Sequence, residues 1–314
     1  MTNLIQSLTI VAPVFLLVLI GYLIKKRGMI DDQFNKTASK IVFNITMPAL
    51  VFQEISTTNY AEVFNLKMTL FTNLAILILY GFTWLISPLL CKNGRDQGAF
   101  IQGSFRSNFA IIGFAMIYNA FGQESLARAA IVLAFIMPLY NILAVIALTV
   151  PMHKEKRADI GKVIKDIITN PLILAALAAL PFSYFHVSFH PVLTTTLDYL
   201  AELTLPLALL SIGSSMSFYS IKKDFKLSLI AAAIKIIIIP LVSITAAIKL
   251  GFDEKDLGIL FFFFGSPTAV ASYIMAEAMG SNAKLAGNII LLSTLGSIFT
   301  LAAGLYIMKS QGYF

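Results

Sequence analysis

Residues 95–122 read RDQGAFIQGSFRSNFAIIGFAMIYNAFG and residues 253–280 read DEKDLGILFFFFGSPTAVASYIMAEAMG, so the two stretches align without a gap at an offset of 158 residues. The same offset places Pro48 on Pro206, with NITMPAL aligned on ELTLPLA around them. Self-similarity of this kind indicates a repeat architecture in which each copy forms one structural unit. The sequence therefore predicts two copies of one unit that meet at a shared interface.

The composition is that of a membrane protein. Of 314 residues, 58% are hydrophobic and 12% are charged, and the mean hydropathy is +0.84, whereas soluble domains carry about 25% charged residues. The net charge of +7 would suit nucleic acid, but the cations lie in short loops between apolar runs and not on one face. The single cysteine, Cys91, excludes an internal disulfide and a cysteine-rich metal site. We expect the lipid bilayer, and no nucleic acid, as a partner.

Apolar runs of the length of a membrane helix recur along the whole chain. A bilayer core about 30 Å thick is crossed by about 20 apolar residues in a helix, and only helices or closed barrels satisfy their backbones there. Runs such as AAAIKIIIIPLVSITAAI exclude the short alternating strands of a barrel. The predicted spans, five in each copy, are 5–24, 38–57, 67–90, 98–121, 127–150, 168–185, 194–217, 227–249, 257–279 and 284–308. The sequence thus predicts an all-α polytopic membrane protein with ten transmembrane helices.

The odd number of spans in each copy predicts that the second copy enters the membrane from the opposite side, as an inverted repeat. Sixteen loop lysines and arginines then fall on one side and five on the other, which by the positive-inside rule places both termini outside the cytoplasm. We predict a first repeat at 1–150, a cytoplasmic linker at 151–158 and a second repeat at 159–314 in a cell membrane.

Two prolines are expected to kink their spans. Proline removes the hydrogen bond to the carbonyl four residues earlier, so Pro48 frees the carbonyl of Asn44 and Pro206 frees that of Glu202. A polar side chain beside a freed carbonyl, repeated at the same offset, suits a site for a coupling ion, H⁺ or Na⁺. The alternative is a kink satisfied by neighbouring helices, with Asn44 bonded across a helix interface.

The fourth and ninth spans are expected to break near their middles, where GSFRSNFAIIG and FFGSPTAVASY interrupt apolar runs. On a continuous helix Arg106 and Asn108 would point about 200° apart, so both can face one cavity only if the backbone unwinds. Unwinding exposes half-helix N-termini that favour an anion, and Arg106 adds a bidentate partner for a carboxylate. Asn108, Ser266 and Thr268 would then meet at the crossing. The alternative is that the small residues only allow close packing, which leaves the charge of Arg106 unexplained.

The remaining polar candidates fit less well. Lys235, in the middle of its span, could balance Glu202 or extend toward the cytoplasmic face. His186 and His190 have helical spacing but no companion carboxylate or cysteine, so no metal site is expected. The sequence contains no nucleotide-binding glycine loop, HExxH or GxSxG motif. We therefore expect neither an enzyme nor a bound cofactor.

The segments FNITMPALVF, FRSNFAIIGFAM, LTLPLALLSIG and GSPTAVASYIMAEAMG resemble the auxin efflux carrier family, particularly its bacterial malate and malonate permease-like members. The resemblance covers essentially the whole chain. It implies a fold similar to sodium/proton antiporters and bile-acid symporters, with broken helices four and nine crossing at the substrate site. Spans one, two, six and seven would form a scaffold and dimer interface, and the others a moving transport domain. Asn108 matches the family's crossover asparagine and Pro267 its ninth-span proline, whereas the fourth span here has Phe109 and no proline.

The predicted function is secondary transport of a small organic anion, a mono- or dicarboxylate such as malate or malonate, by alternating access in a homodimer. The substrate residues predicted for it are Arg106, Ser107, Asn108, Ser266, Pro267, Thr268 and Ser272. The residues predicted for ion coupling or for the kinks are Asn44, Pro48, Glu202, Pro206 and Lys235. Two alternatives stay open: a cation-coupled carrier of a bulkier amphipathic anion, auxin-like or bile-acid-like, and a membrane sensor without flux.

Overall fold

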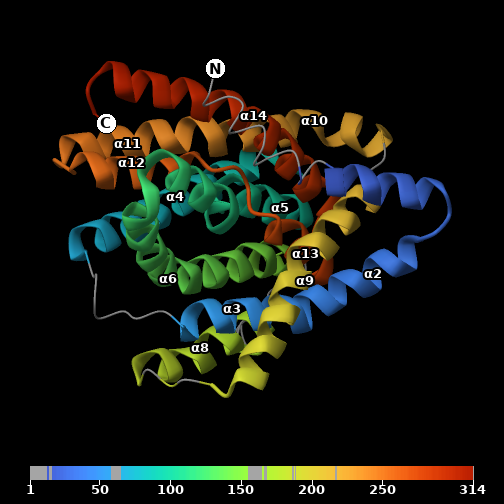
Figure 1. The fold of residues 1–314 in the computed structure, drawn as a ribbon. Coiled ribbons are helices and arrows are strands. Elements are labelled where there is room, and N and C mark those ends of the chain that lie inside the picture. Colours follow the sequence, from blue (N-terminus) through green and yellow to red (C-terminus); the bar gives the residue numbers. More distant parts are fainter. Residues whose placement is uncertain are drawn as a thin grey trace.

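The computed structural model describes residues 13, 16–57, 65–154, 165, 168–185, 187, 189–215 and 218–313, and this part of the chain is helical (Figure 1). The only β-type pairing between described residues is an isolated bridge of Ser107 and Thr268. The start of the span predicted at 5–24, the second half of the predicted linker and His186 lie outside the described residues.

Helices follow one another along the described chain with short connections. Residues 16–26 are helical, and the named elements follow. They are α2 (Asp32–Ile41), η1 (Val42–Thr46), α3 (Met47–Ser56), α4 (Leu66–Leu90), α5 (Gly94–Phe105), η2 (Phe109–Gly113), α6 (Phe114–Lys154), α8 (Pro171–Tyr184), α9 (Pro191–Ser215), α10 (Phe218–Ala233), η3 (Ile234–Ile238), α11 (Ile239–Lys249), α12 (Glu254–Gly265), α13 (Ala271–Ala278) and α14 (Ala283–Ser310). The label η marks a π-helical turn.

Several of these helices have the length and hydropathy of membrane spans. Five helical segments among the described residues are long and apolar enough to cross a bilayer: Leu66–Leu90, Phe135–Met152, Pro191–Ser214, Asp224–Lys249 and Ala283–Ser310. Their outward-facing side chains include large exposed leucines and isoleucines, which a bilayer would cover. The molecule is therefore a multi-pass membrane protein.

The helices pack as two groups (Figure 1). In one group α3 packs against α8 and α9, and α2 packs against α9. In the other, α5 packs against α4, α6 and α14, while α10 packs against α14 and α12 against α6 and α11. The short helix α13 contacts α14 in this second group and also α2 and α9 in the first. The line along which the two groups meet thus passes beside α13.

Two of the three π-helical turns lie immediately before a proline. The turn Val42–Thr46 ends two residues before Pro48, and Ile234–Ile238 ends two residues before Pro240. A proline cannot donate to the carbonyl four residues earlier and its ring crowds that carbonyl, so the preceding turn widens by one residue. Around Pro206, by contrast, α9 continues as an α-helix. The aligned prolines Pro48 and Pro206 therefore shape their helices differently.

Gly122 and Gly280, which are aligned by the 158-residue offset, both have a positive φ angle. Their φ angles are 77° and 76°, values that residues with a Cβ rarely adopt. Gly122 kinks α6, and Gly280 follows the end of α13. A glycine with positive φ thus ends each of the two stretches that define the repeat.

Candidate functional site

The fourth and ninth predicted spans are both interrupted near their middles. Helix α5 ends at Phe105, and Arg106 is extended, with φ −77° and ψ 119°. Helix α12 ends at Gly265, and Ser266 is also extended, with φ −60° and ψ 144°. Helical structure resumes at Phe109 and at Ala271. The structure thus has the unwinding that Arg106 and Asn108 need in order to face one cavity.

The two extended segments pair with each other. The amide of Asn108 donates to the carbonyl of Pro267 at 2.7 Å, and the amide of Ala269 donates to the carbonyl of Arg106 at 3.1 Å. These bonds flank the antiparallel bridge between Ser107 and Thr268. Non-helical backbone is tolerated at membrane depth only where its polar groups are satisfied inside the protein. Each break therefore satisfies backbone groups of the other, and the fourth span breaks without a proline.

Three hydroxyl groups hold the crossing by donating to carbonyls of the half-helices. Ser107 Oγ donates to Phe263 at 2.7 Å, Ser266 Oγ to Phe262 at 2.6 Å, and Thr268 Oγ1 to Gly103 at 2.6 Å. Carbonyls in the last turn of a helix lack an intrahelical partner, and the hydroxyls of Ser107 and Thr268 supply one to Phe263 and Gly103. The Phe262 carbonyl accepts from the Ser266 amide as well, at 3.1 Å. The hydroxyls of Ser266 and Thr268, predicted as substrate ligands, therefore bind the backbone, and neither residue lines the cavity described next.

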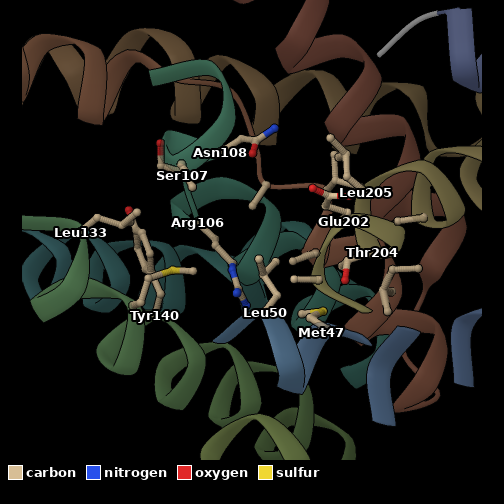
Figure 2. Close-up of a pocket in the computed structure, with 18 of the residues that line it drawn as sticks. Met47, Leu50, Arg106, Ser107, Asn108, Leu133, Tyr140, Glu202, Thr204 and Leu205 are labelled. Atoms are coloured by element: carbon tan, nitrogen blue, oxygen red, sulfur yellow. The ribbon is translucent and has the colours of Figure 1, made fainter. Parts of the chain in front are cut away.

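A cavity of about 380 Å³ lies beside the crossing, between the two groups of helices (Figure 2). Side chains and backbone from α3, α6, α9 and the start of α13 form its walls. Its residues with polar side chains are Arg106, Ser107, Asn108, Tyr140, Glu202 and Thr204. Most of the other lining residues are aliphatic, including Met47, Leu50, Leu133, Met137, Leu205 and Ile274. The cavity is thus largely apolar, with a few polar groups placed along it, as ligand sites commonly are.

Arg106 is the only arginine or lysine among the cavity residues. The residue is 3% exposed. One guanidinium nitrogen donates to Asn141 Oδ1 at 2.7 Å and another to Met275 Sδ at 2.8 Å. Both acceptors are uncharged, so they orient the guanidinium without neutralising it. An oriented guanidinium at the wall of a cavity can bind a carboxylate through two parallel hydrogen bonds.

Glu202 and Pro206 line the cavity from the opposite group of helices, on α9. Figure 2 shows Arg106, from the extended segment after α5, and Glu202, from α9, at the cavity. Asn44 lies elsewhere: it is exposed, its amide donates to the carbonyl of Lys40 at 2.8 Å, and it is not among the cavity residues. Pro48, which was predicted to kink the same span, is also not among the cavity residues. The structure therefore brings Glu202, but not its aligned partner Asn44, to the site.

Lys235 is fully buried and is not among the residues that line the cavity. Its ammonium group donates to the carbonyl of Phe264 at 2.7 Å, in the last turn of α12. A cation is favourable at a helix C-terminus, where unpaired carbonyls and the helix dipole concentrate negative charge. The sequence predicted that Lys235 would either balance Glu202 or extend toward the cytoplasmic face. The structure shows neither, because the buried ammonium group binds a backbone carbonyl. The partner of the lysine is a backbone atom of the broken ninth span.

The structure also adds residues that the sequence interpretation missed. Tyr140 and Thr204 line the cavity, and Asn141 orients Arg106. Asn141 carries a signal that could have found it, because an asparagine in an apolar span is costly unless it has a partner. Ser272 lies one residue beyond the cavity-lining Ala271, and its buried hydroxyl has no hydrogen-bond partner among the described residues.

No group of three His, Cys, Asp or Glu side chains within the described ranges is arranged to hold a metal ion. Among the residues that line the cavity, Glu202 has the single carboxylate and Tyr140 the single phenol. The cavity thus combines one cationic side chain, one carboxylate and largely apolar walls.

Comparison with known proteins places this chain among transporters. A family model described as a membrane transport protein matches residues 6–304. An uncharacterized transporter of Methanocaldococcus jannaschii is 24% identical over 303 residues, covering 93% of this chain and 96% of that protein. A Rhizobium meliloti protein whose name proposes a malonate transporter is 23% identical, covering 96% of this chain and 95% of that protein. An uncharacterized transporter of Escherichia coli K12 is 19% identical over 312 residues, covering 95% of this chain and 96% of that protein.

Proposed function

The chain belongs to the auxin efflux carrier family of membrane transport proteins, and from this premise we propose that it is a secondary transporter of a small organic carboxylate. The observation that carries the proposal is the guanidinium of Arg106 at the wall of an otherwise largely apolar cavity, beside the crossing of two broken helices. The cost of burying a charge within a membrane protein is usually repaid by function. A substrate carboxylate would supply the second half of a bidentate pair.

The start of α13 supports the same substrate charge. Ala269, Val270 and Ala271, which lead into the helix, all line the cavity. A helix N-terminus carries partial positive charge and favours an anion near it. Arg106 and this N-terminus would therefore act on the same carboxylate from two directions.

The walls of the cavity favour a substrate with an apolar body. One arginine and mainly aliphatic surroundings fit one carboxylate on an alkyl or aromatic group better than two carboxylates, because a second anion would lose its hydration without a matching cation. A dicarboxylate such as malonate or malate is the rival substrate, favoured by the name of the Rhizobium relative. An amphipathic indole acid would also fit the apolar walls.

Alternating access is the mechanism we propose, with the inverted repeats as its architecture. In support, Thr204 Oγ1 donates to Thr46 Oγ1 at 2.9 Å, a bond between two residues that are themselves 158 apart. Equivalent residues that touch each other indicate a local two-fold axis between the copies. The group containing α2, α3, α8 and α9 would be the scaffold, and the group around α5 and α12 would move with the substrate.

We further propose the cellular setting that the sequence predicts. The protein would lie in the cell membrane with both termini outside the cytoplasm and would form a homodimer through its scaffold. Coupling to H⁺ or Na⁺ is proposed to involve Glu202, because it is the acidic residue of the cavity. The repeat boundaries at 1–150, 151–158 and 159–314 complete the proposal.

Transport by purified protein in sealed vesicles tests the proposal. Labelled 4-methylpentanoate, a monocarboxylate with an apolar body, and labelled malonate are offered separately and then in competition. Uptake above that of protein-free vesicles supports transport, and stronger competition by 4-methylpentanoate supports the apolar-body interpretation. Ligand binding seen as a thermal shift without any flux would replace the carrier with a membrane sensor. Imposing pH, sodium and voltage gradients one at a time then identifies the coupling ion.

A further inference from the structure

The cavity holds two opposite charges on facing walls. Arg106 follows α5, and Glu202 projects from α9 in the other helix group. Glu202 is exposed, and no hydrogen bond or ion pair joins it to another described residue. Figure 2 shows the Glu202 carboxylate and the Arg106 guanidinium on different sides of the space between them. The cavity thus presents a cationic and an anionic side chain from different helix groups.

A plain carboxylate fits only one of these two charges. Bound at Arg106, it would share the cavity with the carboxylate of Glu202, and like charges repel each other. A substrate that carries a cationic group as well as a carboxylate removes this repulsion and gains an ion pair instead. The acceptor oxygens of Glu202 lie on that wall for an ammonium group.

We propose that the cavity selects a zwitterion: a carboxylate for Arg106, an ammonium group for Glu202 and an apolar side chain for the aliphatic walls. This combination describes an α-amino acid with an alkyl or aromatic side chain. The cavity volume of about 380 Å³ accommodates a ligand of that size. The inference rests on the proposed function, because it names the substrate class of the same site.

The test compares two compounds that share a carbon skeleton. Leucine and 4-methylpentanoate differ by the amino group alone, so their uptake ratio in proteoliposomes isolates the contribution of the ammonium. Wild-type protein is expected to take up leucine at least tenfold more efficiently than 4-methylpentanoate. Glu202→Gln keeps the size of the side chain but removes its charge, and it is expected to lower that ratio at least tenfold by slowing leucine uptake.

A matched control lies one helical turn away. Asp198, also on α9, accepts a hydrogen bond from Gln53 and does not line the cavity. Asp198→Asn makes the same change of charge on the same helix, and the uptake ratio should stay at the wild-type value. An equal loss in both variants would assign the effect to the net charge of the scaffold and overturn the inference.

The outcomes separate the inference from the proposed function. If wild-type protein prefers 4-methylpentanoate to leucine, or if Glu202→Gln leaves the ratio unchanged while Arg106 is still required for uptake, carboxylate transport stands and zwitterion selection is wrong. If neither compound crosses the membrane and neither shifts the melting temperature, the proposed function itself fails. The wild-type preference alone decides the inference should Glu202→Gln fail to fold.

Discussion

The two broken helices differ in the cation that each one holds. Arg106 belongs to the broken segment of the fourth span, and its side chain lines the cavity. The second break has Phe264 at the aligned position, and the carbonyl of Phe264 instead binds Lys235, which comes from another helix and is fully buried. Both cations lie at the crossing, but only Arg106 lines the cavity. The difference teaches that position relative to the cavity, and not charge alone, distinguishes the residue proposed to bind substrate from the lysine that binds the backbone.

The breaks also differ in how they are encoded. The ninth span has Pro267 at its break, whereas the fourth has Phe109 at the aligned position and unwinds all the same. Both share the reciprocal backbone bonds and the hydroxyl groups that hold the half-helix ends. The crossing is therefore maintained by pairing between the two segments, and the proline is one contributor to it. Substitutions at the two cations and at the two breaks test this comparison.

The largest effect is expected from Arg106→Ala. Charge-assisted hydrogen bonds to a carboxylate contribute about 1.5–3 kcal/mol each, so uptake should fall roughly 100-fold or more, while the protein stays folded. Initial uptake rates in proteoliposomes measure the loss, and the melting temperature reports folding. Arg128→Ala, on α6 but outside the cavity, is the matched control. Transport at the wild-type rate in Arg106→Ala would remove the arginine from the substrate site.

Lys235→Met should act mainly on stability. Methionine fills a similar volume but leaves the Phe264 carbonyl without its donor, and an unsatisfied buried carbonyl costs about 1–3 kcal/mol. The melting temperature in detergent should therefore fall, whereas the affinity for substrate should change little. Lys249→Met, at the exposed end of α11, controls for the loss of a lysine. A large loss of affinity with unchanged stability would contradict the division of roles between the two cations.

Much of the architecture follows from the sequence, because the repeat offset and the interrupted apolar runs locate both breaks. The sharing of one cavity by Arg106 and Asn108 follows from helical geometry, since two residues 200° apart on a helix can meet only after unwinding. The partner of Lys235 could not be predicted, because a backbone carbonyl leaves no mark in the sequence. The hydrogen-bond partners of the Ser266 and Thr268 hydroxyls could not be predicted either, because helical periodicity does not apply to an extended segment.

Asn44 shows a second limit. The offset aligns it with Glu202, but Asn44 lies within the π-helical turn Val42–Thr46, whereas α9 is a continuous α-helix around Glu202. A π-turn holds an extra residue and so rotates the side chains that follow it relative to a regular helix. Equivalent positions in the two copies therefore face different surroundings, and only Glu202 reaches the cavity.

Thr268→Val tests the hydroxyl bonds that hold the crossing. Valine keeps the shape of threonine and removes the donor to the Gly103 carbonyl, and a lost hydrogen bond with a buried unpaired acceptor costs about 1–3 kcal/mol. We expect a lower melting temperature, by less than the change in Lys235→Met, where a charged donor is lost. Thr196 is exposed on α9, and its hydroxyl donates to the carbonyl of Val192. Thr196→Val should therefore leave the melting temperature almost unchanged. Equal effects in the two variants would show that the Gly103 bond contributes nothing special to the crossing.

The smallest effect is expected from Pro267→Ala. If pairing holds the breaks, alanine should work nearly as well as proline, because the carbonyl at position 267 that accepts from Asn108 is retained. The remaining cost is the greater freedom of the unfolded chain without proline, which is worth about 0.4–1 kcal/mol. Uptake should stay within roughly threefold of wild type, and the melting temperature should fall slightly. The same assays used for Arg106→Ala measure both quantities. A collapse of transport in Pro267→Ala would mean that the ninth span needs its proline to stay unwound, and that the two breaks, alike in the folded structure, depend on different physical causes.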